Sequence, residues 1–253
     1  MNQAKTDLVL RIGALYPEQL NIYADRGNLI FLRRRCEWRG IEFRLLESGP
    51  GEPLDPRSVD LIYVGGGQDS DQASIAKDML ETKRSGLVEA LSDGAALLAV
   101  CGGYQLLGYR CELDDRIVGG LGICDFETRR EDGPRLIGNV AIEADGFDGA
   151  PLTLAGFENH AGRTYLGSEA NPLGKVLEGF GNNGKDQTEG VRDGRLIGTY
   201  LHGPLLPKNA AVADWLVSQA LARTSGDPVA LEPLPDALED AAHESALRAA
   251  ERS

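Results

Sequence analysis

The chain has 253 residues and carries 26 Lys and Arg against 39 Asp and Glu, which gives a formal net charge of −13. Hydrophobic residues make up 42% and charged residues 26% of the chain, as in folded globular proteins. This length fits one large domain, or one domain with an appendage. The negative charge opposes binding to DNA or RNA, and no apolar run approaches the about 20 residues of a membrane span.

The four cysteines contain no C-x-x-C pair, so neither a disulfide scaffold nor a zinc ribbon is indicated. The N-terminus lacks the basic region and apolar core of a secretory signal. We therefore expect a cytoplasmic protein with no metal site.

Strands, glycine-rich turns and helices follow one another through the first half of the chain. Residues 95–100 (AALLAV) contain no polar side chain, which is typical of a central strand in a parallel sheet covered on both faces. Apolar patterning predicts strands at residues 8–12, 41–46, 59–64 and 95–100, with helices at 28–39, 72–80 and 86–92. The arginines of the first helix (Arg33, Arg34, Arg35 and Arg39) are expected to form a solvated face, and docking on a partner is the alternative.

The second half changes to short alternating segments, which predict antiparallel pairs beside an extension of the sheet. Strands are expected at residues 135–143, 152–158, 174–178 and 196–200, and a helix at 209–223. Residues 226–253 hold seven acids and two arginines. We expect a main domain over residues 1–225, followed by this acidic tail, whose residues 238–252 favour a helix that is either solvated or docked on a partner.

Cys101 carries the strongest chemical signal. It ends the buried strand at 95–100 and is followed by Gly102 and Gly103, which allow a tight turn into a helix. This is the strand-turn-helix pattern of a nucleophile elbow, and a helix N-terminus favours the reactive thiolate. The alternative is a buried structural cysteine.

A cysteine nucleophile needs a base, and the chain has three histidines. His202 ends the expected strand at 196–200 and leads into a Gly-Pro turn, which places it at the same sheet edge as Cys101. His160 is the competitor, although no clear strand is expected before it, and His243 lies in the acidic tail. The G-x-G-x-x-G match at residues 179–184 lacks a preceding strand and a following helix, so a dinucleotide site is not expected there.

Four motifs, in this order, resemble the class I glutamine amidotransferase family, in the branch that contains cobyric acid synthase. They are YVGGGQD at 63–69, CGGYQ at 101–105, GFENH at 156–160 and GTYLHGP at 198–204. The resemblance runs from about residue 8 to about residue 209. It implies an α/β, flavodoxin- or Rossmann-like fold: a mostly parallel sheet flanked by helices, with extra antiparallel strands in the second half.

The resemblance also implies a function. It points to a glutaminase that hydrolyses L-glutamine to glutamate and ammonia. It further implies a heterodimer with a MurT-like Mur ligase subunit, which takes up the ammonia and amidates the D-glutamate of lipid II in peptidoglycan synthesis. The ATP and magnesium of that reaction are expected in the ligase, and no cofactor is expected in this chain.

Site residues follow from the same motifs. Cys101 matches the nucleophile that forms a γ-glutamyl thioester, and His202 matches the base. Arg135 and Gln105 match positions associated with glutamine binding. The Gly102 N–H, with that of Gly66 from the run at 65–67, is expected to form the oxyanion hole.

One position departs from the family pattern. Many members have a carboxylate two residues after the histidine, where this chain has Pro204. This departure suggests the hypothesis that an acidic residue of the partner completes the triad. Two other interpretations stay open: a free-standing cysteine hydrolase acting on peptides or γ-glutamyl compounds, and a scaffold protein in which Cys101 is inert.

Overall fold

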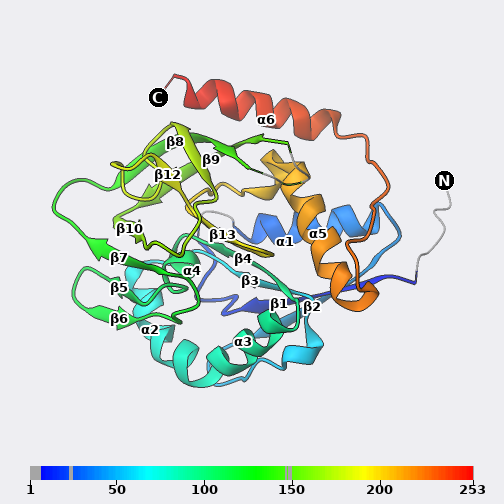
Figure 1. The fold of residues 1–253 in the computed structure, drawn as a ribbon, viewed down its shortest axis with the longest axis horizontal. Coiled ribbons are helices and arrows are strands. Elements are labelled where there is room, and N and C mark those ends of the chain that lie inside the picture. The colour runs from blue at the N-terminus through cyan, green and yellow to red at the C-terminus, as the bar shows by residue number, and fades with distance from the viewer. Residues whose placement is uncertain (1–6, 23–24, 146, 148–149, 253) are drawn as a thin grey trace.

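The computed structural model describes residues 7–22, 25–145, 147 and 150–252. A six-stranded sheet with the order β13-β14-β4-β3-β1-β2 lies at its centre (Figure 1). Neighbouring strands pair in parallel, except that β13 is antiparallel to β14. The strands are β1 (Val9–Leu15), β2 (Glu42–Ser48), β3 (Leu61–Val64), β4 (Ala96–Val100), β13 (Val191–Asp193) and β14 (Leu196–Thr199).

Helices cover both faces of this sheet (Figure 1). One face carries α1 (Arg26–Glu37) and α5 (Ala210–Ser225), which also contact each other. The other face carries α2 (Asp69–Asp78) and α3 (Arg84–Ser92), joined by a π-helical turn at Met79–Lys83. Every residue of β3 and β4 is buried, as central strands covered on both faces require. The expected α/β fold is confirmed.

Two smaller sheets are built mainly from antiparallel pairs of the second half. One has the order β10-β7-β5-β6 and the other β12-β11-β8-β9. Their strands are β5 (Arg110–Glu112), β6 (Ile117–Gly119), β7 (Phe126–Arg130), β8 (Leu136–Ala144), β9 (Leu152–His160), β10 (Gly162–Leu166), β11 (Gly174–Glu178) and β12 (Thr188–Glu189). The extra antiparallel strands are thus confirmed, although β5, β6, β7, β10 and β12 were not expected individually.

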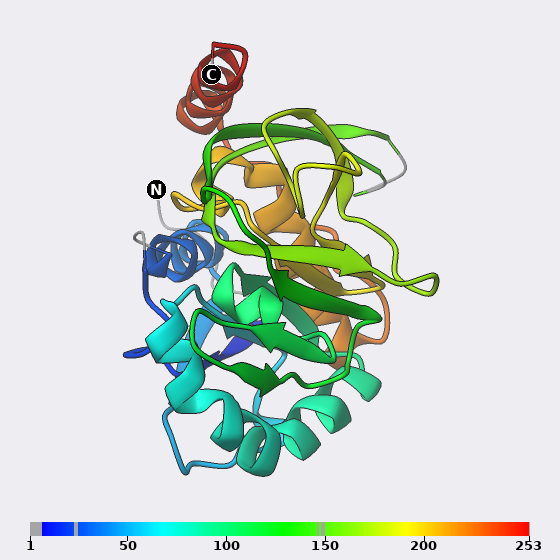
Figure 2. The ribbon, with the colours of Figure 1, turned by 90° about the vertical axis from the view of Figure 1, so that its left-hand side faces the viewer.

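Residues 226–252, called here the C-terminal segment, cross the outside of the molecule and end in α6 (Ala237–Ala250). This helix packs against β8, β9 and the short helix at Leu206–Lys208, as Figures 1 and 2 show. The expected helix is confirmed, and one side of it packs on the body of the protein, while its docking on a partner stays a prediction. Over the described part of the chain, no helix combines the length and the apolar character needed to cross a membrane.

Arg35 ties this segment to the body. Its fully buried guanidinium donates to Asp214 of α5 at 2.8 Å and to Asp236 of the C-terminal segment at 2.9 Å. Arg39, one turn later, donates to Asp214 and to the Glu232 carbonyl at 2.7 Å. The expected solvated face is therefore wrong for these two arginines, because residues four apart share one side of a helix and this side faces α5.

Candidate active site

Four loops that follow parallel strands of the central sheet meet at one edge. They carry Asp25 after β1, the glycines at 65–67 after β3, Cys101 after β4 and His202 after β14. The carboxyl ends of parallel strands share one edge, and ligands of open α/β sheets bind there. The topology therefore brings together residues that are up to 177 positions apart in the sequence.

Cys101 is held in a strained backbone conformation, with φ at 48° and ψ at −107°. Its N–H donates to the Thr199 carbonyl at 2.8 Å, so the turn continues the pairing of β14 with β4. The short helix α4 (Gly102–Gln105) begins at once and lies so close to β3 that a Cβ on Gly103 would be 2.7 Å from the Val64 carbonyl oxygen. A left-handed non-glycine residue costs about 1–3 kcal/mol and marks a sharp turn at a reactive group. The predicted elbow is present.

His202 and Asp25 form a buried pair. The His202 Nδ1 lies 3.1 Å from Oδ2 and 3.2 Å from Oδ1 of Asp25, and both side chains are fully buried. The backbone of His202 is fixed by two hydrogen bonds with Phe157 of β9. A carboxylate at Nδ1 sets the tautomer and the orientation of the imidazole, which leaves Nε2 for the reacting groups.

Cys101 is the second partner of His202. Burial lowers the pKa of His202, but the charge of Cys101 and hydrogen bonds to Asp25 and Cys101 outweigh this and raise the pKa to about 10. The imidazole therefore holds its proton at neutral pH, beside the sulfur. A protonated histidine next to a cysteine stabilises the thiolate, which is the nucleophilic form.

Asp25 supplies a carboxylate to His202 from within this chain, and the hypothesis of an acidic partner residue at the triad stays a prediction. At the position where a carboxylate was sought, Pro204 packs on the first turn of α1: a Cβ on Gly27 would lie 2.6 Å from the proline Cγ. Asp25 immediately precedes that turn. Sequence reasoning missed Asp25, although its place in the loop after the first strand, at the edge already assigned to Cys101 and His202, was a usable signal.

The other three cysteines have a different environment. Burial raises the pKa of Cys36 and of Cys124 to about 12, and it raises the pKa of Cys111 as well. All four cysteines are free thiols. Buried cysteines with raised pKa values are poor nucleophiles, so Cys101 is the one cysteine that is placed beside a base.

A cavity of about 440 Å³ opens beside Cys101, and its lining includes Gly67, Gln105 and Arg135. Arg135 donates from Nε to Asn159 Oδ1 at 2.8 Å and from Nη2 to the Asn159 carbonyl at 2.9 Å. Within the described residues, Nη1 has no hydrogen-bond acceptor. The predicted arginine is therefore held at the cavity with one donor nitrogen left for a ligand.

Gln105 also lines the cavity, but both ends of its amide contact protein groups. Its Nε2 donates to the Tyr200 hydroxyl at 3.0 Å, and its Oε1 lies 3.9 Å from the Cys111 sulfur. The Tyr200 hydroxyl in turn contacts Thr164 Oγ1 at 2.7 Å. Gln105 thus belongs to a buried polar network that shapes the cavity wall.

His160 forms another part of the wall. Its ring stacks on Tyr200 at 3.6 Å between centroids, and its Nδ1 lies 2.8 Å from the Gly162 carbonyl. Burial lowers the pKa of His160, so the ring is neutral. Contrary to expectation, His160 does end a strand, β9, but the group next to its Nε2 is Glu158, at 3.5 Å.

The backbone amides of the glycines near Cys101 have two different roles. The Gly66 N–H donates to Asp25 Oδ2 at 3.2 Å, so in this structure the amide expected in the oxyanion hole supports the His202–Asp25 pair. The nitrogen of Gly67 lies 3.0 Å from where a Cβ on Gly102 would be, and Gly67 lines the cavity. Gly67 and Gly102 are the two amides that the fold places side by side next to Cys101.

The glycine-rich run at 179–184 has a structural role. The Phe180 and Gly181 N–H groups donate to the buried Glu158 carboxylate at 2.7 and 2.9 Å. Amides that would cradle a phosphate in a dinucleotide site are already satisfied here, in agreement with the sequence-based interpretation. The described residues also contain no group of three or more His, Cys, Asp or Glu side chains that could hold a metal ion.

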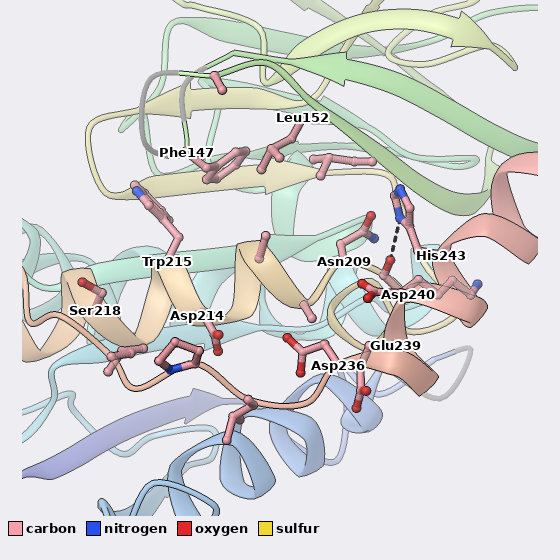
Figure 3. Close-up of a pocket in the computed structure, with 18 of the residues that line it drawn as sticks. Phe147, Leu152, Asn209, Asp214, Trp215, Ser218, Asp236, Glu239, Asp240 and His243 are labelled. Atoms are coloured by element: carbon pink, nitrogen blue, oxygen red, sulfur yellow. Dashed lines mark hydrogen bonds between the residues drawn. The ribbon is translucent and has the colours of Figure 1, made fainter.

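A second, larger cavity of about 910 Å³ lies between α5, the start of β9 and the C-terminal segment (Figure 3). Its lining includes Trp215 and Asp214 of α5, and Asp236 and His243 of the segment. His243 contacts the Lys208 carbonyl at 2.8 Å, drawn as the dashed line in Figure 3, and Thr153 at 3.3 Å. This histidine fastens α6 to the body.

A family model described as a CobB/CobQ-like glutamine amidotransferase domain matches residues 11–210. The chain belongs to this family. The match covers all four loops of the site and ends at the start of α5, so the C-terminal segment lies outside it. A solved structure of PurLQS from Thermotoga maritima covers 85% of this amidotransferase and 96% of its own chain, with a TM-score of 0.50 and 16% identity, and shows the fold alone.

Individual proteins of the family show which of its members this chain is similar to. The lipid II isoglutaminyl synthase (glutamine-hydrolyzing) subunit GatD of Staphylococcus aureus is 42% identical over 207 residues, which is 81% of this chain and 82% of that protein. The GatD subunit of Streptococcus pneumoniae is 36% identical over 230 residues, 90% of this chain and 87% of that protein. A probable cobyric acid synthase of Methanothermobacter thermautotrophicus is 31% identical over 211 residues, which is 77% of this chain but 38% of that protein.

Proposed function

We propose that this chain is the glutamine-hydrolysing subunit of a lipid II isoglutaminyl synthase. The observation that carries the proposal is the series Cys101, His202 and Asp25 beside a cavity that also presents Arg135. The similarity to two GatD subunits over most of both chains supports the choice of this reaction within the amidotransferase family.

In the proposed mechanism, the Cys101 thiolate attacks the side-chain amide carbon of L-glutamine. The N–H groups of Gly102 and Gly67 stabilise the oxyanion that forms. His202 donates its proton to the leaving nitrogen, so ammonia departs and a γ-glutamyl thioester remains. His202 then takes a proton from water, whose oxygen attacks the thioester. The carbon–sulfur bond then breaks, Cys101 leaves as the thiolate beside the protonated His202, and the product departs as glutamate after its new carboxyl group gives a proton to ammonia or to water.

Arg135 and Asp25 have supporting roles in this proposal. Arg135 binds the α-carboxylate of the substrate through its remaining nitrogen, because a guanidinium suits a planar carboxylate. Asp25 is a positioning residue that acts through His202. Gln105 is assigned to the cavity wall, where it contacts the substrate chain from the Tyr200 side.

The acceptor of the ammonia lies outside this chain. We assign the ATP- and magnesium-dependent amidation of the D-glutamate of lipid II to a MurT-like Mur ligase subunit that forms a heterodimer with this chain. This reaction is a step in building the cell wall. We propose that it takes place in the cytoplasm. Four free thiols support a reducing compartment.

The test is ammonia release from L-glutamine by the wild-type chain and by Cys101→Ser, each alone and mixed with a MurT-like ligase. We expect activity that disappears in Cys101→Ser in both settings. Cys124→Ser is the matched control, because its thiol is buried outside the cavity, and it should keep the activity. Glutamine hydrolysis that survives in Cys101→Ser would contradict the proposal.

The free-standing cysteine hydrolase is the second candidate, because the Asp25–His202 pair needs no partner residue. It predicts that the chain releases amines from peptides or γ-glutamyl compounds while leaving L-glutamine intact. The same assay, run with γ-glutamyl anilide beside L-glutamine, separates the two candidates by which substrate is consumed.

A further inference from the structure

The motif at residues 63–69 ends in a carboxylate that the mechanism above does not use. Asp69 is the first residue of α2, two positions after Gly67. A capping box fixes this turn: the Gln68 side chain accepts from the Asp71 N–H, and Asp71 Oδ2 accepts from the Gln68 N–H at 3.0 Å. The backbone that carries Asp69 is thus held next to the amides proposed for the oxyanion hole.

Three charged side chains line the catalytic cavity: Asp69, Asp114 and Arg135. Asp114 is paired with Arg130 at 2.8 Å. Asp69 has no ion pair within the described residues, and its one hydrogen bond is from the Asp114 N–H to Oδ2, at 3.1 Å. The Oδ1 of Asp69 therefore remains available to a cationic ligand at a cavity that already offers a guanidinium.

Asp69 and the reacting cysteine belong to one cavity. Asp69 and Cys101 both line the volume of about 440 Å³. Asp69 begins α2, and Gln72 of the same helix contacts Cys111 Sγ, which also contacts Gln105. Asp69 and Cys101 thus border the same small volume.

We propose that Asp69 binds the α-ammonium group of L-glutamine and makes this cavity selective for free α-amino acid amides. The inference rests on the proposed function and deepens it. An amino acid presents one carboxylate and one ammonium on the same carbon, separated from the side-chain amide by two methylene groups. Arg135 and Asp69 match these two charges, while Cys101 faces the amide.

The consequence is discrimination against amides without a positive charge at that carbon. Glutaramic acid has the carboxylate and the amide of L-glutamine but no amino group, and N-acetyl-L-glutamine has a neutral nitrogen there. Either ligand leaves the Asp69 carboxylate desolvated without a partner. Sites built around a charged contact reject analogues that lack the contact much more strongly than apolar pockets reject a missing methylene.

The experiment measures binding of L-glutamine and glutaramic acid by calorimetry in the full chain carrying Cys101→Ala, with and without Asp69→Asn. Asparagine keeps an oxygen for the Asp114 N–H, so this substitution removes mainly charge. We expect Asp69→Asn to weaken L-glutamine binding on the order of 10- to 100-fold and to strengthen glutaramic acid binding, because no unpaired carboxylate is left in the complex. Asp114→Asn, the matched control at the same cavity, should leave the ratio of the two affinities unaltered.

Two results would overturn the inference. If Asp69→Asn left both affinities unchanged, this carboxylate would not bind the ammonium group. If it weakened both ligands equally, Asp69 would have a structural role. Failure of the proposed function looks different: the wild-type chain would neither hydrolyse nor bind L-glutamine, in the presence or absence of the ligase.

Discussion

The two cavities of this protein differ in the state of their charged groups. At the larger cavity, Asp214 and Asp236 of the lining pair with the buried Arg35, and Asp214 also pairs with Arg39. In the smaller one, Cys101 has a strained backbone and a protonated histidine beside it. The ion pairs beside the larger cavity therefore form a structural joint between α1, α5 and the C-terminal segment, whereas the smaller cavity holds the nucleophile and its base. Cavity size alone would not have identified the catalytic cavity.

This joint attaches the C-terminal segment to the body of the protein. Arg35 connects α1, α5 and the C-terminal segment through carboxylates that are each about a quarter exposed, at 26%. Burying a guanidinium is costly unless its donors are satisfied, and here both partners are needed. Removing a carboxylate from either cavity should thus have distinct effects, on turnover in one and on stability in the other.

The largest effect should come from Asp25→Asn. Losing the carboxylate removes the group that orients His202, so we expect kcat to fall on the order of 10²- to 10⁴-fold, with a much smaller change in KM. Steady-state ammonia release measures both constants. Asp214→Asn removes a carboxylate from the larger cavity and should keep kcat within a few fold. Full activity in Asp25→Asn would mean that another residue, such as one of the partner, orients His202. It would also contradict the functional difference between the two cavities.

A smaller effect, on stability alone, is expected for Asp236→Asn. Arg35 keeps Asp214 but loses a charged acceptor, so the free energy of unfolding should fall by about 1–2 kcal/mol. Urea denaturation measures the loss, and proteolysis should cut the C-terminal segment faster. Arg34→Gln, whose partner Glu37 is exposed, is the control and should cost less than about 0.5 kcal/mol. A fall in kcat without a fall in stability would contradict the structural role of this joint.

The last prediction concerns the pH dependence of stability. Burial raises the pKa of Glu189 to about 8. Hydrogen bonds from the Tyr200 N–H at 2.6 Å and from the Thr199 hydroxyl lower this pKa but do not offset the effect of burial. The unfolded chain releases this proton near the ordinary value of 4.5, so the folded state binds more protons between pH 4.5 and 8. Stability should therefore decrease as pH rises through this window.

Glu189→Gln should flatten that decrease, which urea titrations at pH 5, 6.5 and 8 would reveal. Unlike Asp214 and Asp236 of the larger cavity, Glu189 has no ion pair within the described residues. An equally steep decrease in the variant would assign the pH dependence to other groups.

Much of the fold was predictable because each central strand carries a local pattern. The apolar run before Cys101 and the turn residues after His202 are short-range signals, and both residues lie where these signals placed them. Arg135 and Gln105 were reached through motif resemblance, and both line the cavity; their contacts with substrate stay predictions.

The remaining features depend on contacts between distant segments. Asp25 precedes His202 by 177 residues, and its position after the first strand indicates the sheet edge but not this contact. Arg35 resembles its exposed neighbours Arg33 and Arg34 in every local respect, and only the packing of α5 separates them. Gly66 and Gly67 are adjacent and chemically identical, so their different partners follow from loop geometry alone.

The left-handed backbone at Cys101 has a consequence for the sequence itself. Glycine would adopt that conformation without strain, so the residue that best suits the fold at this position is not the one that reacts. A sequence optimised for stability alone would favour glycine at this position. The cysteine at the elbow therefore exchanges some stability of the fold for a nucleophile at the turn.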